Sequence, residues 1–157
     1  MKNLSIIAIL TLSACSSVED ITYNYPYISN LTNTECLSSH TDIYNLDSDT
    51  GSGTFEMTLK GRTGICRFTS LDYPCDFGKV NIKVSYADGV LKIVEYPSSD
   101  NADCRCETDA SFIIENIPDN DFILKIYHAD MNGKFNENNP TYTRKVNLVD
   151  GGLSIPY

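Results

Sequence analysis

Short segments in which apolar and polar residues alternate recur along the chain from about residue 36 to residue 157. In residues 54–60 the apolar side chains are at positions 55, 57 and 59, and in residues 80–86 they are at 80, 82, 84 and 86. Successive side chains of an extended chain point to opposite faces, so the pattern predicts strands with one buried face. The segments predicted as strands are 54–60, 80–86, 90–96, 111–117, 122–128, 142–148 and 153–157.

Turn-forming residues separate the predicted strands. Asp88-Gly89 lies between two β-rich segments, which is a strong signal for a hairpin. Pro118-Asp119-Asn120-Asp121 joins two others, and there proline sets φ while the Asx side chains accept hydrogen bonds from local amides. No window shows the 3.6-residue apolar period of a helix. The sequence therefore predicts an all-β, antiparallel β-sandwich of about seven strands, or a small barrel.

The segment from Ser111 to Ile126 carries a family resemblance. Its strand ends in Asn116-Ile117-Pro118, turns through Asp and Asn, and re-enters a strand at Phe122. This arrangement resembles a signature of prealbumin-like β-sandwich domains of the carboxypeptidase-regulatory type. The resemblance favours a prealbumin- or immunoglobulin-like sandwich and implies no activity.

The first residues of the chain are typical of an export signal. Lys2 precedes a short apolar stretch, 4–12, which is too short for a bilayer span of about 20 residues. The sequence Leu12-Ser13-Ala14-Cys15 then resembles the lipobox of bacterial lipoproteins. The resemblance implies that residues 1–14 are a signal peptide and that Cys15 is lipidated. Two or three acyl chains on Cys15 would give a stable membrane anchor.

The residues after Cys15 suggest where the anchored protein resides. Ser16-Ser17-Val18-Glu19-Asp20 resembles the acidic surface-export signals of Bacteroidota-type lipoproteins. We therefore expect an exported protein anchored to the outer membrane, either in the periplasm or exposed at the cell surface. Residues 15–35 are predicted to be a tether or a loosely packed first strand, and residues 36–157 the sandwich domain.

The net charge of the chain disfavours some classes of binding partner. The chain has 157 residues, with 12 basic and 21 acidic side chains, and a formal net charge of −9. Binding to phosphates needs clustered Lys and Arg, so this balance disfavours a nucleic-acid partner. It equally disfavours a basic patch that docks on anionic lipid. The remaining expectation is a protein or glycan partner in the envelope, with the membrane reached through the lipid anchor.

Cysteine usage fits an exported protein. Five cysteines follow Cys15, and in an oxidising compartment they are expected to form disulfides, leaving one thiol. Cys104 and Cys106 are two residues apart, so each is expected to pair with a different partner. The candidate partners are Cys36, Cys66 and Cys75. The arrangement of a Cys-x-Cys before a strand of the pattern Asp-x-Ser-Phe-x-Ile looks similar to that of small cysteine-containing lipoproteins of uncharacterised function. The rival interpretation is a zinc site formed by Cys66, Cys75, Cys104 and Cys106, although the spacing is not that of the two Cys-x2–4-Cys knuckles usual in structural zinc sites.

Two polar or aromatic segments are candidate binding sites. Tyr23, Tyr25 and Tyr27 alternate, so an extended chain would present them on one face as a platform for sugar rings or for a partner, or simply as a strand edge. Residues 130–139 are rich in oxygen donors and loosely resemble a calcium loop. The candidate calcium ligands are Asp130, Asn132, Asn136 and Asn138, and the simpler interpretation is an Asn-Gly turn.

No catalytic motif is present in the sequence. We therefore predict a lipid-anchored, non-enzymatic binding or interaction module of the cell envelope, without a required cofactor. One alternative is an inhibitor of a secreted enzyme such as lysozyme, because small anchored β domains resemble envelope inhibitors of that enzyme. An acidic protein would also be steered toward a basic enzyme. The other alternative is a glycan-binding surface lipoprotein.

Overall fold

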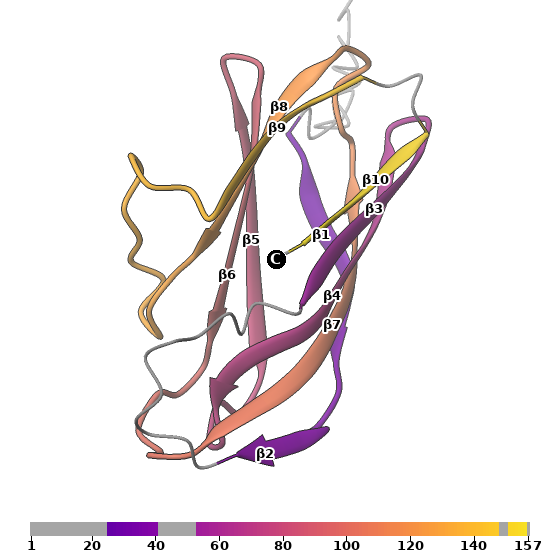
Figure 1. Ribbon diagram of the computed structural model, residues 1–157. Coiled ribbons are helices and arrows are strands. Elements are labelled where there is room, and N and C mark those ends of the chain that lie inside the picture. The colour runs from indigo at the N-terminus through magenta and orange to yellow at the C-terminus, as the bar shows by residue number, and fades with distance from the viewer. Residues whose placement is uncertain (1–24, 41–52, 148–150, 157) are drawn as a thin grey trace, which may run out of the picture.

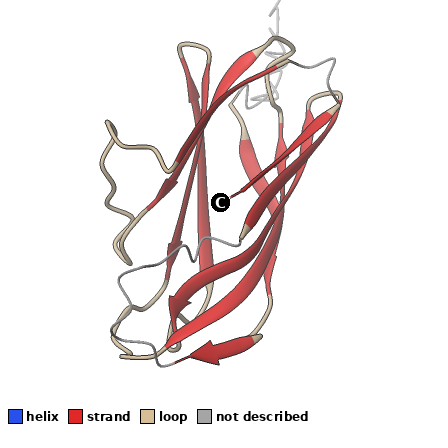
Figure 2. Cartoon of the chain, viewed as in Figure 1, coloured by secondary structure: helices blue, strands red, loops and turns tan. Residues whose placement is uncertain are grey.

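A computed structural model describes residues 25–40, 53–147 and 151–156 of the chain. This part contains only strands, turns and loops, arranged as two sheets that face each other (Figure 1, Figure 2). It contains no helix long and apolar enough to cross a membrane. The strands are β1 (Tyr27–Asn33), β2 (Ser38–His40), β3 (Thr54–Lys60), β4 (Thr63–Pro74), β5 (Val80–Ala87), β6 (Val90–Pro97), β7 (Arg105–Glu115), β8 (Phe122–His128), β9 (Tyr142–Val146) and β10 (Gly152–Pro156).

The two sheets differ in size and in the direction of their strands. Sheet A has the order β1-β7-β4-β3-β10, with β2 also paired to β7, and sheet B has the order β5-β6-β8-β9. The predicted all-β sandwich is confirmed. All pairs are antiparallel except β6–β8, which is parallel and departs from the predicted antiparallel pattern. The chain leaves β6 for sheet A, reverses direction in β7 and returns to sheet B as β8. Two reversals give β6 and β8 the same direction.

Sheet A begins before residue 36, the predicted start of the sandwich domain. Within the segment predicted as a tether or first strand, Tyr27–Asn33 forms β1 and pairs antiparallel with β7. The remaining residues of that segment before Tyr25 lie outside the described part of the chain, as does the lipobox. The hairpin between β5 and β6 is as predicted: Asp88 and Gly89 both have positive φ, 51° and 77°. Two positive φ values in a two-residue turn match the twist of paired strands.

The strand β4 was not predicted, because a bulge interrupts its alternation. Cys66 and Phe68 are buried before the bulge, whereas Leu71 and Tyr73 are buried after it. Phe68 pairs with Ala110 and Leu71 with Thr108, so two residues of β4 lie opposite one residue of β7. An extra residue moves every later side chain to the other face, and the period-2 pattern disappears from the sequence.

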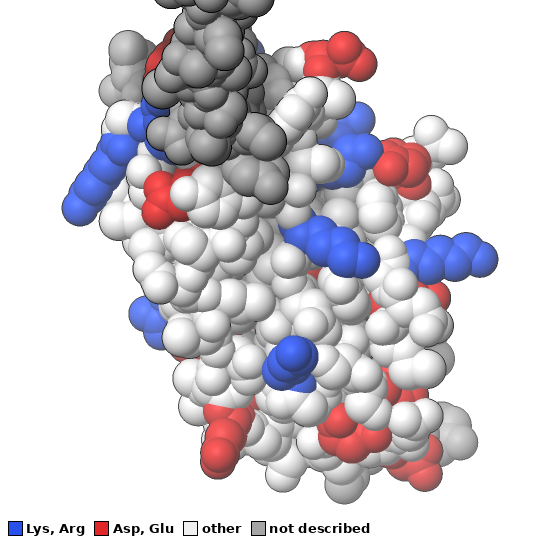
Figure 3. Space-filling model, turned by 180° about the vertical axis from the view of Figure 1, so that it is seen from behind, with Lys and Arg blue, Asp and Glu red and all other residues white. Residues whose placement is uncertain are grey.

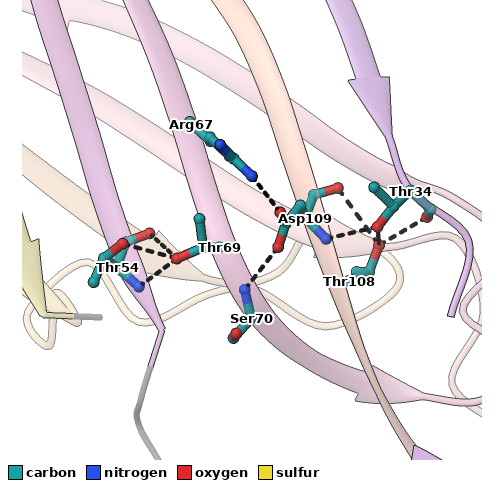
Figure 4. Close-up of polar contacts among 7 residues, drawn as sticks. All are labelled: Thr34, Thr54, Arg67, Thr69, Ser70, Thr108 and Asp109. Atoms are coloured by element: carbon teal, nitrogen blue, oxygen red, sulfur yellow. Dashed lines mark hydrogen bonds and ion pairs between the residues drawn. The ribbon is translucent and has the colours of Figure 1, made fainter. Parts of the chain in front are cut away.

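Asp109 of β7 holds this bulge (Figure 4). Its Oδ1 accepts a hydrogen bond from the backbone N–H of Ser70 at 3.1 Å, and Ser70 has a positive φ of 52°. Its Oδ2 accepts a hydrogen bond from Arg67 Nη2 at 2.7 Å. On the other side, the backbone N–H of Asp109 donates to the Thr34 hydroxyl at 2.9 Å. One side chain of β7 thus stabilises the irregular part of β4.

The core lies between the two sheets. Sheet A contributes an aromatic row in which the rings of Phe55 and Phe68 are 4.7 Å apart and those of Phe68 and Phe112 are 5.9 Å apart. Sheet B contributes aliphatic side chains, among them Leu91, Ile93, Leu124 and Ile126, all fully buried. Burial of apolar surface is the main term that stabilises such a sandwich.

Two disulfides link the segments at one end of the sandwich. Cys36 is bonded to Cys106, and Cys75 is bonded to Cys104. The prediction that Cys104 and Cys106 pair with two of Cys36, Cys66 and Cys75 is confirmed. The left-over cysteine is Cys66, which is buried in the core. Burial without a charged partner raises the pKa of its thiol far above the usual range, so the thiol stays protonated. The disulfide bonds also contradict a zinc site at these cysteines.

Candidate binding groove

The outer face of sheet B, the face turned away from the core, is partly covered by residues 129–141. This loop joins β8 to β9 and extends beyond the sheet in Figure 1. The ring of Phe135 lies 4.6 Å from the ring of Tyr127. Lys92 Nζ lies 2.7 Å from a carboxylate oxygen of Glu137, and the Tyr127 hydroxyl donates to the Glu137 carbonyl at 3.2 Å. These contacts hold the loop against strands β6 and β8.

A groove of about 520 Å³ lies where the edge strands of the two sheets, β1 and β5, approach each other. Tyr27 at the start of β1 lines it and is 51% exposed, and Phe135 of the loop lines it as well. The remaining lining residues are Pro26, Ile28, Ile82, Lys83, Val84, Ser85, Lys92, Val94 and Glu137. The groove therefore combines apolar walls with a small number of polar groups, as ligand sites commonly do.

A second hollow of about 230 Å³ continues along the same face of sheet B. It shares Ser85, Lys92 and Glu137 with the groove, and it adds Lys125. We call the groove and this hollow together the sheet B channel. Figure 3 shows the molecule from behind: Lys and Arg are the main charges across its middle, whereas Asp and Glu gather toward its lower end.

A buried ion pair lies at the end of the sandwich that carries the disulfides. Glu95 of β6 is fully buried, and its Oε1 is 2.6 Å from Nδ1 of His128, its register partner in β8. Tyr73 stacks on the imidazole with ring centroids 5.6 Å apart. The hydrogen bond to Glu95 raises the pKa of His128, and this outweighs the desolvation of the imidazole, which lowers it.

The Glu95–His128 pair resembles the acid-oriented histidine of many hydrolases, in which the imidazole also contacts a nucleophile. Among the described residues, no Ser, Thr or Cys side chain forms a hydrogen bond with the His128 ring. Cys66, the one thiol among the described residues, is buried in the core and bonds to the Gly64 carbonyl. The described part of the chain also contains no group of three or more metal-ligating side chains.

Two of the three tyrosines of the predicted platform lie among the described residues. Tyr25 is 72% exposed and Tyr27 is 51% exposed, while Pro26 between them is buried. Tyr23 lies outside the described residues. Of the two described tyrosines, Tyr27 lines the groove and Tyr25 does not.

The candidate calcium loop is folded by its own hydrogen bonds. Asp130 Oδ1 accepts from the backbone N–H groups of Asn132 and Lys134, at 2.9 and 2.8 Å. Asn136 Oδ1 accepts from the backbone N–H of Asn138 at 3.0 Å. These are the contacts of successive Asx turns, and Gly133 has the positive φ that such a turn requires. The contacts favour the turn interpretation, and calcium binding stays a prediction to be tested.

Sequence reasoning missed the lysines of the channel and the Glu95–His128 pair. One signal was present for Glu95, because it follows Leu91 and Ile93 at the inward positions of its strand. A carboxylate at an inward position needs a partner. No comparable signal marks Lys92 and Lys125, because single lysines on the outer face of a strand are ordinary.

Comparison of the chain with protein-family models, with curated proteins and with solved structures gave no significant match.

Proposed function

We propose that the protein is a lipid-anchored, non-enzymatic binding module of the bacterial cell envelope, and that its ligand binds in the groove between β1 and β5. The observation that carries the proposal is the half-exposed Tyr27 beside Phe135 in a groove of ligand size. Aromatic side chains with one exposed face are enriched at binding surfaces because they supply much contact area at little entropic cost.

The covalent features support an envelope location. Two disulfides fit an oxidising compartment outside the cytosol. Cys15, the expected lipidation site, precedes Tyr25 by 25 − 15 = 10 residues. Ten residues span at most about 35 Å when fully extended. An anchor at Cys15 would therefore keep β1 and the groove close to the membrane surface.

The test is capture of ligand from solubilised envelope by the full chain, compared between two variants. Tyr27→Ala removes the exposed ring of the groove, and Leu37→Ala removes an exposed apolar side chain of similar exposure, 58%, which does not line it. We expect a stoichiometric ligand on the wild type and on Leu37→Ala, and its loss on Tyr27→Ala. Equal capture by all three proteins would place the binding site elsewhere.

A second candidate function is inhibition of a secreted basic enzyme such as lysozyme. Asp76, Asp100 and Asp103 favour it, since they lie in the loops beside the disulfide Cys75–Cys104. An acidic surface attracts a basic enzyme at long range. A lysozyme activity assay with wild type and Asp100→Asn separates the two proposals, because Asp100 does not line the groove. Unchanged lysozyme activity in the presence of the protein would exclude this candidate.

A further inference from the structure

We propose that the sheet B channel binds an anionic polysaccharide, with the carboxylates of the sugar chain against Lys92 and Lys125 and a sugar ring against Tyr27. This inference rests on the proposed function, because it names the class of ligand for the same groove. It follows from the charge, pairing and shape of the channel.

The outer face of sheet B is rich in lysine in a protein whose net charge is −9, and Asp88 and Glu137 are the acidic residues that line its hollow. Cross-strand register places Lys92 of β6 directly opposite Lys125 of β8. The same face carries Lys83, opposite Val94, and Lys145, opposite Ile123. Like charges directly opposite each other destabilise a sheet. Glu137 offsets this repulsion at Lys92, and a bound anion would offset it at Lys125, so the arrangement favours an acidic ligand.

The two central lysines differ in their partners. Lys92 pairs with Glu137, and its side chain is only 28% exposed. Lys125 forms no ion pair with any carboxylate in the part of the chain that the structure describes. Its ammonium group is therefore available to a ligand carboxylate without displacing an internal partner.

The shape of the sheet B channel favours a polysaccharide over a membrane surface as the ligand. The channel is hollowed beside the loop 129–141, which projects from the sheet (Figure 1). A flat bilayer would contact the loop before it reached the recessed Lys92. A narrow polymer can lie along the channel, with Ser85 and Tyr27 on its walls. Tyr27 provides the apolar ring surface on which the C–H groups of a sugar pack.

The experiment is calorimetric titration of the full chain, solubilised in detergent, with oligogalacturonate and with its fully methyl-esterified, uncharged form. We expect binding of the charged form that weakens with added salt. Lys125→Gln and Lys92→Gln should each raise Kd by about two- to fivefold, the effect of losing one solvent-accessible charge pair. Lys60→Gln, which makes the same charge change at the end of β3 in sheet A, should leave Kd unchanged.

Other outcomes would overturn the inference in distinguishable ways. Equal affinity for the esterified form, with loss only in Tyr27→Ala, would contradict the anionic ligand and leave the binding groove in place. Equal or tighter binding of poly-glutamate, or of phosphatidylglycerol vesicles, would replace the polysaccharide by an acidic peptide or a membrane. No binding of either oligosaccharide would exclude the anionic polysaccharide, while the capture experiment with Tyr27→Ala still tests the groove itself.

Discussion

His128 is held by a carboxylate that has no access to solvent. Glu95 is fully buried, and its hydrogen bond to Nδ1 is the largest influence on the pKa of the imidazole. Desolvation is the next largest, and Arg105 and Asp100 contribute less to this pKa. A buried carboxylate is costly unless it is paired, so the pair stabilises the fold best when His128 carries its proton. This dependence on protonation makes the stability of the protein sensitive to pH.

The pKa of His128 is raised above its unfolded value of about 6.5. The stabilisation from the protonated imidazole is therefore fully present below about pH 6.5 and is lost as pH rises through the folded pKa. We expect an NMR titration to give a pKa above 6.5 for His128, and Glu95→Gln to lower it. Assignment with His128→Gln separates its signal from that of His40. A pKa at or below 6.5 in the wild type would contradict the interpretation.

At the scale of elements, β-bulges explain where the sequence pattern fails. Residues 54–60 and 80–86 alternate without interruption, and they are strands as predicted. In β4 the bulge at Ser70 shifts the inward positions from even to odd, so no single period runs through the strand. A second irregularity, in β1 between Ser29 and Thr32, also interrupts the register of a strand with β7. Local periodicity cannot reveal a strand whose register is set by its neighbours.

The bulge in β4 depends on Asp109. Asp109→Ala removes the acceptor for the Ser70 N–H, and we expect a loss of about 1–2 kcal/mol in the free energy of unfolding. Asp109→Asn keeps an acceptor oxygen and loses only the charge attraction to Arg67, so it should cost less than about 1 kcal/mol. Urea unfolding followed by circular dichroism measures both. Equal losses of stability for the two substitutions would mean that the hydrogen bond from the Ser70 N–H to residue 109 does not stabilise the bulge.

The two disulfides close loops of different length, with sequence separations of 70 and 29 residues. Replacing either pair by serine should lower the free energy of unfolding by about 2–4 kcal/mol. The loss should be greater by about 0.8 kcal/mol for Cys36–Cys106, because the longer loop restricts the unfolded chain more. Chemical unfolding of both double variants under non-reducing conditions checks this order. A larger loss for Cys75–Cys104 would show that native contacts outweigh chain entropy.

The loop 129–141 provides a test of the calcium hypothesis. Asp130 already accepts two backbone N–H groups, and a cation there would compete with them. We expect calorimetric titration with calcium to show weak or no binding, and Asp130→Asn to leave the heat signal unchanged. Tight binding that is lost in Asp130→Asn would establish a calcium site at residues 130–139.

At the scale of the whole molecule, we expect Cys15 to decide where the protein resides. Cys15→Ala should abolish incorporation of labelled lipid and move the protein from the membrane fraction to the soluble fraction. The domain itself should be unaffected, because Cys15 is not one of the four cysteines in the disulfides. Circular dichroism of the soluble variant is the control for folding. Unchanged retention of Cys15→Ala in the membrane fraction would exclude a lipid anchor at this residue.

From the sequence alone follow the class of fold, several turns, and the expectation that two disulfides form and one of the five cysteines after Cys15 is left over. Alternation of apolar residues, the Asp88-Gly89 turn and the odd number of cysteines are local or countable features, and physical chemistry assigns each a consequence. Only the tertiary structure decided which strands pair, that β6 and β8 are parallel, and that Lys92 lies opposite Lys125. It likewise placed Tyr27 and Phe135 in the lining of one groove and brought Glu95 to His128. These contacts join residues far apart in the chain, and their register depends on how both sheets pack around one core.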